Sequence, residues 1–338
     1  LSSVPSHFIM RRVLVNGDRY TTERLQKLEQ DLNEASTKIL ELERDLYLEI
    51  RDSLKKYVSY LHQISQEVAN TDAICSYAQA AIQHKWVCPE ITDDGIFEIK
   101  NGRHPVVEKH LPTGEFVPND SFLSSDDDEI PSFALITGPN MAGKSTYLRQ
   151  NALIALLAQT GSFVPADSAK LGIVDRMFCR VGASDNLAKG ESTFLVEMTE
   201  TANILHAATN RSLVIMDEVG RGTSTEDGLA IAKAVSEYLL DTVKCKTFFA
   251  THYHELSRLK HTSLKFLCMD VLEQNGRVVF LRKIKEGVTE NSYGIHVAKL
   301  AGIPPEVIDR ANEILCDIQA ANGDEYVFEE KKIIENEN

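Results

Sequence analysis

The sequence predicts an α/β fold with a mainly parallel sheet, preceded by a long helical segment and followed by a helix-turn-helix. Residues 21–70 place apolar residues at a helical period and contain neither Pro nor Gly. From about residue 87, short apolar runs alternate with helical runs, which is typical of a parallel sheet covered on both faces. Two helical runs flank the sequence AGIPPEVI near the C-terminus.

The long helical segment carries a heptad repeat, formed by Leu25, Leu28, Leu32, Ala35, Ile39, Leu42 and Leu46. Such a repeat predicts either a helix that packs one stripe on a neighbouring helix or a parallel dimeric coiled coil. The first interpretation is favoured. In both, the helix is long and stiff and could act as a strut.

Composition and charge exclude several classes of protein. The 338 residues allow two or three structural units, and the formal net charge of −14 argues against a broad basic surface for nucleic acid. No apolar run approaches the roughly 20 residues of a membrane span, and no signal peptide is recognisable. The six cysteines form no CxxC pair, which favours a reducing cytosol over a zinc site or a disulfide framework. Because the first residue is Leu, we expect a fragment of a longer chain.

A phosphate-binding loop (P-loop) is predicted at TGPNMAGKST, between the apolar strand 133–137 and the helix 145–159. Its backbone N–H groups would surround phosphate. Lys144 would reach the β- and γ-phosphates, and the Ser145 hydroxyl would ligate Mg²⁺. The predicted nucleotide-binding residues are Gly138, Pro139, Asn140, Met141, Ala142, Gly143, Lys144, Ser145 and Thr146.

A second catalytic element is predicted at SLVIMDE, residues 212–218. Its apolar residues predict a buried strand next to the P-loop strand, with Asp217 at the carboxyl end where ligands bind in such sheets. Asp217 would hold Mg²⁺ through water, and Glu218 would orient or deprotonate the attacking water. Glu218 as a mere surface acid is the less favoured interpretation, because an Asp followed directly by Glu is typical of hydrolysing P-loop ATPases.

The next strand is predicted at KTFFATH, residues 246–252. His252 at its end could reach the γ-phosphate, although a lone His is more often structural. His254 is expected to be part of the scaffold. The loop GRGTST, residues 220–225, could cross to another subunit or change shape with nucleotide, or could be a simple turn.

The C-terminal helix-turn-helix does not have the composition of a DNA reader. Its second helix presents Glu306, Val307, Ile308 and Asp309 before Arg310, whereas base contacts need Arg, Lys, Asn or Gln. We expect a packing or dimerisation element.

Together these motifs resemble the MutS family of DNA mismatch-repair ATPases. The matching segments are GRHPVVE (102–108), FVPND (116–120), TGPNMAGKSTYLRQ (137–150), GASDNLAKGESTFLVEM (182–198), DEVGRGTST (217–225), ATHYHEL (250–256) and SYGIHVAKLAGIP (292–304). The N-terminal VPSHFIMRRVLVNGDRYTTERL resembles the chain leaving the family's DNA clamp and entering its lever helices. The form GESTFLVEM is similar to the bacterial, mismatch-recognising subfamily.

The resemblance implies an ATPase of the ABC type that binds ATP or ADP with Mg²⁺ and acts as a homodimer through the ATPase domain. Phe116 matches the aromatic residue that stacks on adenine, and Asn140 matches an Asn that contacts the phosphates. Ser192, with Thr193, matches the signature that completes the ATP site of the opposite subunit. It further implies mismatched double-stranded DNA as a ligand of the longer protein, a MutL-like repair factor as partner, and a location in the bacterial cytosol near the nucleoid.

The predicted domains are the end of the clamp with the lever helices (1–86), an ABC-type ATPase domain (87–290), a helix-turn-helix dimerisation element (291–320) and an acidic tail (321–338). Two alternatives remain open. One is an ABC-type ATPase of another coiled-coil DNA-repair or chromosome-maintenance protein, which should carry an LSGGQ-like signature and a longer arm. The other is a nucleotide-gated scaffold that does not hydrolyse ATP.

Overall fold

The structure is a computed structural model that describes residues 4–14, 17–112, 114–127, 129–139, 141–182, 193–274, 277–289 and 293–318. The chain divides into two units, Leu1–Cys75 and Ser76–Asn338, and each is described by itself. The predicted acidic tail, 321–338, lies outside the described residues.

The first unit begins with an antiparallel hairpin of β1 (Ile9–Leu14) and β2 (Gly17–Thr21). Helix α1 (Glu23–Lys55) follows, and the Thr22 side chain caps it by accepting a hydrogen bond from the Leu25 N–H at 3.2 Å. Its 33 residues give a length of about 50 Å. No residue of α1 is buried, so the apolar side chains of the heptad repeat are exposed in this chain.

The helix predicted over residues 21–70 is not continuous. Helix α1 ends at Lys55, and α2 (Val58–His84) begins after a turn at residues 56–57. Neither Pro nor Gly occurs at this turn, so the sequence holds no recognisable signal for the break. The end of α2 at His84 agrees with the change of pattern expected near residue 86.

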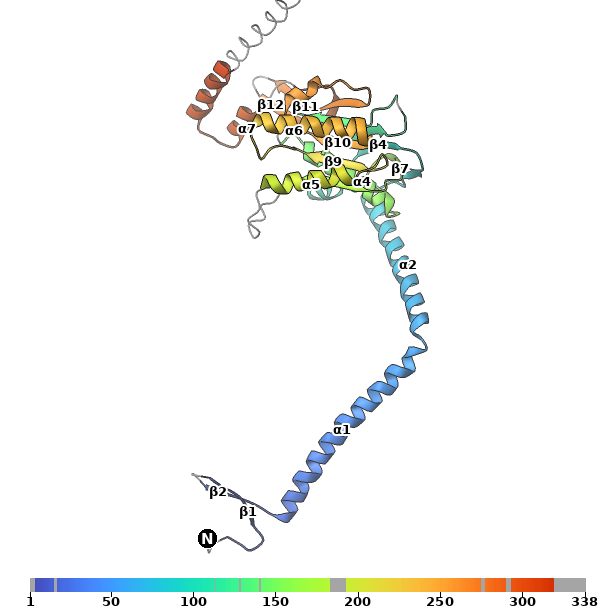
Figure 1. Ribbon diagram of the computed structural model, residues 1–338, viewed down its shortest axis with the longest axis vertical. Coiled ribbons are helices and arrows are strands. Elements are labelled where there is room, and N and C mark those ends of the chain that lie inside the picture. The colour runs from blue at the N-terminus through green and yellow to red at the C-terminus, as the bar shows by residue number, and fades with distance from the viewer. Residues whose placement is uncertain are drawn as a thin grey trace, which may run out of the picture. The chain divides into compact units, whose positions relative to one another are not determined.

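The second unit is built around a six-stranded sheet with the order β12-β11-β6-β10-β9-β8 (Figure 1). Neighbouring strands are parallel except β11 and β12, which form an antiparallel hairpin, so the predicted mainly parallel sheet is confirmed. The strands are β6 (Phe133–Thr137), β8 (Met177–Val181), β9 (Leu213–Asp217), β10 (Lys246–Ala250), β11 (Leu264–Gln274) and β12 (Arg277–Glu286).

The strand order corrects one prediction. We expected β9, which ends at Asp217, to lie next to the P-loop strand β6. Instead β10 lies between them and pairs with both. Nothing in the local sequence of β9 or β10 encodes this order, because both are short apolar runs that could occupy either position.

A smaller sheet, which the sequence pattern did not reveal, has the order β3-β7-β4-β5. Its strands are β3 (Glu90–Thr92), β4 (Ile96–Gly102), β5 (Asn119–Ser124) and β7 (Ser168–Gly172). The helical segments of this unit are α3 (Pro105–His110), α4 (Lys144–Gln159), α5 (Thr193–Ala207), α6 (Thr225–Tyr238) with a π-helical extension Leu239–Val243, a 3-10 turn His254–Arg258, and α7 (Gly294–Leu300).

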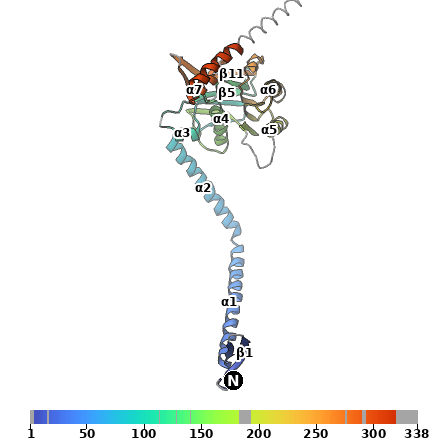
Figure 2. The same cartoon turned by 90° about the vertical axis from the view of Figure 1, so that its left-hand side faces the viewer.

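Apolar residues on both faces of the larger sheet form two cores. On one face, Ala134 and Ile136 of β6 pack with α4 and with the smaller sheet. On the other face, Phe133 and Leu135 pack with α5 and α6, which lie together at one side of the unit in Figure 2. Alternate residues of one strand thus face opposite cores, as expected for a sheet covered on both sides.

The described chain ends with two helical segments, α7 and residues 305–318. Ile308 is buried, whereas Leu300, Ile303 and Val307 are exposed. Among the described residues, no helix combines the length and the apolar composition that crossing a membrane requires.

Candidate nucleotide-binding site

The predicted P-loop joins β6 to α4 through a backbone that needs glycine. Gly138 has φ +131° and Gly143 has φ +111°, both in the region that L side chains rarely adopt. A Cβ added to either glycine would also press on Met269 of β11, at 3.2 Å. Gly143 precedes Lys144, the first residue of α4, so the loop leads directly into the helix N-terminus.

Lys144 is folded over this loop. Its side chain is only 4% exposed, and its Nζ donates a hydrogen bond to the Gly138 carbonyl at 2.5 Å. Burial lowers the pKa of Lys144, and the carboxylates of Glu218 and Asp217 partly oppose this shift. A lysine side chain held beside a glycine-containing loop at a helix N-terminus is suited to bind the terminal phosphates of a nucleotide.

Asp217 and Ser145 form the candidate magnesium ligands. Asp217 ends β9 and is 8% exposed, and it accepts a hydrogen bond from the Ser145 side chain. Burial raises the pKa of Asp217, and Ser145 opposes this shift. Asp217 Oδ1 is buried without a hydrogen-bond partner in the described structure. A buried carboxylate oxygen without a partner is costly unless a cation binds it, so these two residues fit a hard divalent ion.

The described residues contain no cluster of three or more His, Cys, Asp or Glu that could hold a metal by itself. Any ion here would therefore take its remaining ligands from phosphate and water, which is typical of Mg²⁺ at phosphate sites.

Glu218 follows directly in an unusual backbone conformation. Its φ is +57°, in the left-handed region that is uncommon for a non-glycine residue, and its N–H donates to the Ala250 carbonyl at 3.0 Å. Its carboxylate is paired with Arg221, with 2.6 Å between Oε2 and Nη1. Strained backbone of this kind is typical of functional sites.

His252 lies close enough to Glu218 for the carboxylate to affect the pKa of His252, but His252 does not line the larger cavity described below. Its side chain is exposed, and its ring packs on Tyr253 with 4.1 Å between centroids. Desolvation lowers the pKa of His252, and Glu218 partly opposes this shift. Its predicted contact with the γ-phosphate remains a prediction.

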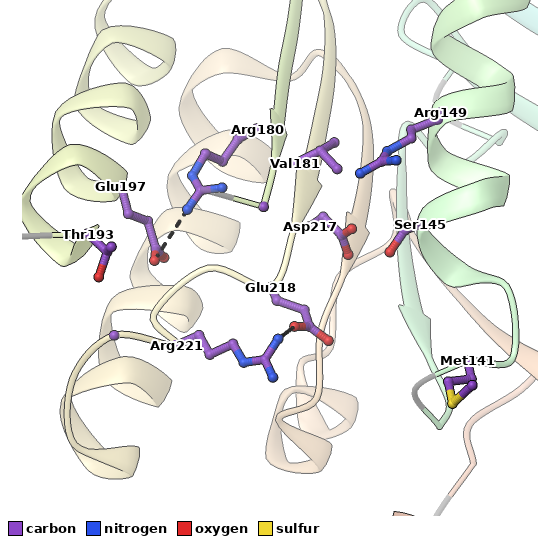
Figure 3. Close-up of a pocket in the computed structure, with 12 residues that line it drawn as sticks. Met141, Ser145, Arg149, Arg180, Val181, Thr193, Glu197, Asp217, Glu218 and Arg221 are labelled. Atoms are coloured by element: carbon purple, nitrogen blue, oxygen red, sulfur yellow. Dashed lines mark hydrogen bonds and ion pairs between the residues drawn. The ribbon is translucent and has the colours of Figure 1, made fainter. Parts of the chain in front are cut away.

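A cavity of about 570 Å³ brings together residues of α4, β9 and α5 (Figure 3). Ser145, Asp217 and Glu218 line it on one side, and Thr193, the first residue of α5, lines it on another. Ser192 and Asn140, the other two residues predicted from the family resemblance at these positions, lie outside the described residues.

A second cavity, of about 280 Å³, is also lined by residues of the predicted P-loop. Phe116 lines it together with Gly143 and Thr146, and its remaining wall includes Val107 of α3. Met141 lines both cavities, with its side chain largely exposed. A pocket of mixed polar and apolar lining with Phe116 in its wall, beside the predicted P-loop, is suited to a nucleotide base.

Four charged residues of the larger cavity were not predicted as site residues: Arg149, Arg180, Glu197 and Arg221. Arg149 lies one turn after Ser145 on α4, so helical periodicity could have found it. Arg180 comes from β8, a strand that the sequence pattern did not indicate. The position of Glu197 depends on how α5 packs, which no local signal encodes.

Comparison with known proteins places the chain in a family. Residues 134–319 match the family model described as MutS domain V, and residues 1–38 match the one described as MutS family domain IV. The chain belongs to the MutS family. The first match alone covers more than half of the chain, including the P-loop, Asp217 and Glu218.

Individual MutS proteins are similar along nearly the whole chain. The DNA mismatch repair protein MutS of Treponema pallidum is 59% identical over 324 residues, which is 96% of this chain and 36% of the relative. The proteins of the same description from Treponema denticola and Acetivibrio thermocellus are 58% and 51% identical, covering 93% and 95% of this chain. The chain thus spans little more than a third of the length of these MutS relatives.

Proposed function

We propose that this chain is the ATPase module of a DNA mismatch-repair protein, which binds and hydrolyses ATP with Mg²⁺. The observation that carries the proposal is the buried, unpartnered Asp217 Oδ1, which lies beside Ser145 and the P-loop in the same cavity as Glu218. Membership of the MutS family supports it, and favours it over the coiled-coil ATPases of double-strand-break repair or chromosome condensation.

In this proposal, the P-loop binds the phosphates of ATP or ADP, and Phe116 stacks on the adenine in the smaller cavity. Lys144 neutralises charge that develops on the β- and γ-phosphates. Ser145 and Asp217 would hold Mg²⁺, Asp217 through water. When bound, the ion supplies further charge neutralisation.

Glu218 acts as the general base in the proposed mechanism. It accepts a proton from the water that attacks the γ-phosphate, while the bond from the γ-phosphorus to the bridging oxygen breaks and ADP leaves. The left-handed backbone of Glu218 and its N–H bond to the Ala250 carbonyl fix the position of the side chain's first atoms. His252 contacts the γ-phosphate from the end of the neighbouring strand β10.

The site is completed by a second copy of the chain. Ser192 and Thr193 face the γ-phosphate that is held by the partner's P-loop, and the C-terminal helices pack on the partner's ATPase domain. The exposed apolar residues Leu300, Ile303 and Val307 support a packing role for these helices. Binding of mismatched double-stranded DNA and of a MutL-like repair factor is proposed for the longer protein.

The proposal is tested by steady-state ATP hydrolysis of the chain and of Glu218→Gln, with Glu226→Gln, an exposed acid at the start of α6, as the matched control. We expect Glu218→Gln to lose turnover by about a hundredfold or more while it still binds ATP, and Glu226→Gln to resemble the wild type. Unchanged hydrolysis in Glu218→Gln would refute the general-base assignment.

Sedimentation with and without a non-hydrolysable ATP analogue tests the composite site. A nucleotide-dependent dimer is expected, and an unchanged monomer contradicts the dimeric site for this chain. Dimerisation on ATP without any hydrolysis in the wild type would instead support a nucleotide-gated scaffold.

A further inference from the structure

A buried carboxylate on α5 holds the loop that follows Glu218. Glu197 is 4% exposed, and its Oε1 accepts a hydrogen bond from the backbone N–H of Gly220 at 2.5 Å. Gly220 is two residues after Glu218 and has φ +88°. A charge-assisted hydrogen bond in a buried setting is among the stronger contacts that a single side chain can make to a loop.

The other carboxylate oxygen of Glu197 faces a cation. Its Oε2 lies 3.4 Å from Nη2 of Arg180, a side chain of β8 that is only 5% exposed (Figure 3). Arg180 also pairs with Glu200, with 3.0 Å between Nε and Oε2, and the Glu200 side chain is half exposed. The negative charge of Glu197 is therefore paired with Arg180 through Oε2, and Oε1 makes the contact with the loop.

The same loop is fixed from two further directions. The Tyr253 hydroxyl donates to the Gly220 carbonyl at 2.8 Å, so both backbone polar groups of Gly220 are hydrogen-bonded. A Cβ added to Gly222 would lie 2.9 Å from Cβ of Phe194, in the first turn of α5. The loop therefore packs against α5 with no room for a side chain at Gly222.

We propose that Glu197 is a positioning residue for Glu218, which sets the orientation of the general base by anchoring Gly220 to α5. This inference rests on the proposed ATPase function. Glu197 lies one helical turn after Thr193, and both residues line the larger cavity. A displacement of the start of α5 is therefore transmitted through Glu197 to the loop that follows Glu218. Glu197 acts through the loop and does not itself touch the reacting atoms.

Three substitutions separate the hydrogen bond from the charge. Glu197→Ala removes both. Glu197→Asp keeps the charge but shortens the side chain by one methylene, so it tests the contact even if the alanine variant does not fold. Glu197→Gln keeps an oxygen acceptor for the Gly220 N–H without the charge. The matched control is Glu200→Gln, which removes the other partner of Arg180 and leaves the loop contact intact.

Two measurements are made on each folded variant. One compares kcat for ATP with the dissociation constant of a non-hydrolysable ATP analogue. The other follows hydrogen exchange of the Gly220 amide in nucleotide-free protein. We expect Glu197→Ala and Glu197→Asp to lower kcat by about tenfold to a hundredfold with nucleotide affinity nearly unchanged, and to speed exchange at Gly220. Glu197→Gln and Glu200→Gln should keep most of kcat and the slow exchange.

The proposal is overturned if Gly220 exchanges at the wild-type rate in a folded Ala or Asp variant, or if Glu200→Gln reproduces their effect. It is also overturned if nucleotide affinity falls in the same proportion as kcat. The exchange measurement needs no hydrolysis, so a wild-type protein without ATPase activity would refute the proposed function and still report on the anchor.

Discussion

The Ser145 side chain donates a hydrogen bond to the Asp217 carboxylate, which joins the first turn of α4 to the last residue of β9. The bond satisfies only part of the carboxylate, since Oδ1 has no partner among the described residues. Burial raises the pKa of Asp217, which means that its ionised form lowers the stability of the fold. The candidate site therefore carries a charge whose favourable partner would be a ligand.

Asp217→Asn is expected to stabilise the nucleotide-free protein and abolish hydrolysis. Asn can still accept from Ser145 but carries no buried charge. We expect a gain of about 1–2 kcal/mol at neutral pH, or an increase of several degrees in Tm. Because the folded-state pKa is raised above 3.8, the wild type recovers this stability as pH falls through that pKa, so the difference should narrow in acid.

Calorimetry between pH 4 and 8 measures this effect, and Asp175→Asn is a control of opposite sign. At Asp175, burial is outweighed by hydrogen bonds from Thr209 and Ser212, which lower its pKa, so its ionised form stabilises the fold. That variant should lose stability at neutral pH. A loss of stability in Asp217→Asn would contradict the assignment of Asp217 as an uncompensated charge.

Phe116→Ala is expected to weaken ATP binding by removing the contact with the adenine base, while the contacts with the phosphates stay unchanged. Loss of stacking on the adenine costs about 1–3 kcal/mol, or roughly a fivefold to hundredfold weaker affinity. Titration calorimetry with ATP measures binding of base and phosphates together, and titration with inorganic triphosphate measures binding of the phosphates alone. Triphosphate should bind wild type and variant equally, because it contacts only the P-loop. Equal weakening of both ligands would show that Phe116 supports the loop and does not bind the base.

Arg103→Ala is expected to loosen the end of α2. Its guanidinium donates to the carbonyls of His84 and Lys85, at 3.3 and 3.1 Å, and pairs with Glu108 of α3 at 2.9 Å. Loss of these contacts leaves helix-terminal carbonyls and a carboxylate unpaired, at a cost of about 1–3 kcal/mol.

Thermal unfolding and the fluorescence of Trp86, the single tryptophan, report on Arg103→Ala. Trp86 lines the same cavity as Arg103, so its emission should shift to longer wavelength as water enters. Arg51→Ala is the control, because the contacts of the Arg51 side chain among the described residues are exposed ones with Asp52. Identical emission in wild type and Arg103→Ala would contradict the proposed role of Arg103 in holding the end of α2.

Lys246→Met is expected to stabilise the protein, and the gain should depend on pH. The Lys246 side chain is fully buried, and its Nζ has no hydrogen-bond partner in the described part of the chain. Burial lowers its pKa below 10.5. The free-energy cost of the buried Lys246 charge is therefore fully present below the folded-state pKa and is lost as pH rises towards 10.5.

Thermal unfolding of Lys246→Met at pH 7 and at pH 10 measures this dependence, with Lys233→Met, an exposed lysine of α6, as control. The advantage of the variant should be a few degrees at pH 7 and smaller at pH 10. A constant advantage across this range would indicate a packing effect and not a buried charge.

Local sequence signals predicted the elements that carry their own chemistry. The strand ending at Asp217 and the strand ending before His252 were found because apolar runs are recognised within a few residues, whereas the P-loop, inferred from glycine spacing, stays a prediction. The smaller sheet was missed, since its strands lack the continuous apolar runs of β6, β9 and β10. The anchoring of Gly220 by Glu197 was missed because it joins two elements that meet only in the folded chain.

The position of β10 between β6 and β9 has a consequence for the width of the candidate site. Thr251 donates its N–H to the Ile136 carbonyl, and Ala250 accepts from the N–H of Glu218, both at 3.0 Å. Two adjacent residues at the end of β10 therefore link β6 and Glu218, the proposed general base, to one backbone segment. Two strand spacings amount to about 9.6 Å. This separation is set by backbone hydrogen bonds, so side-chain substitutions in the cavity should change its charge and leave its width unaltered.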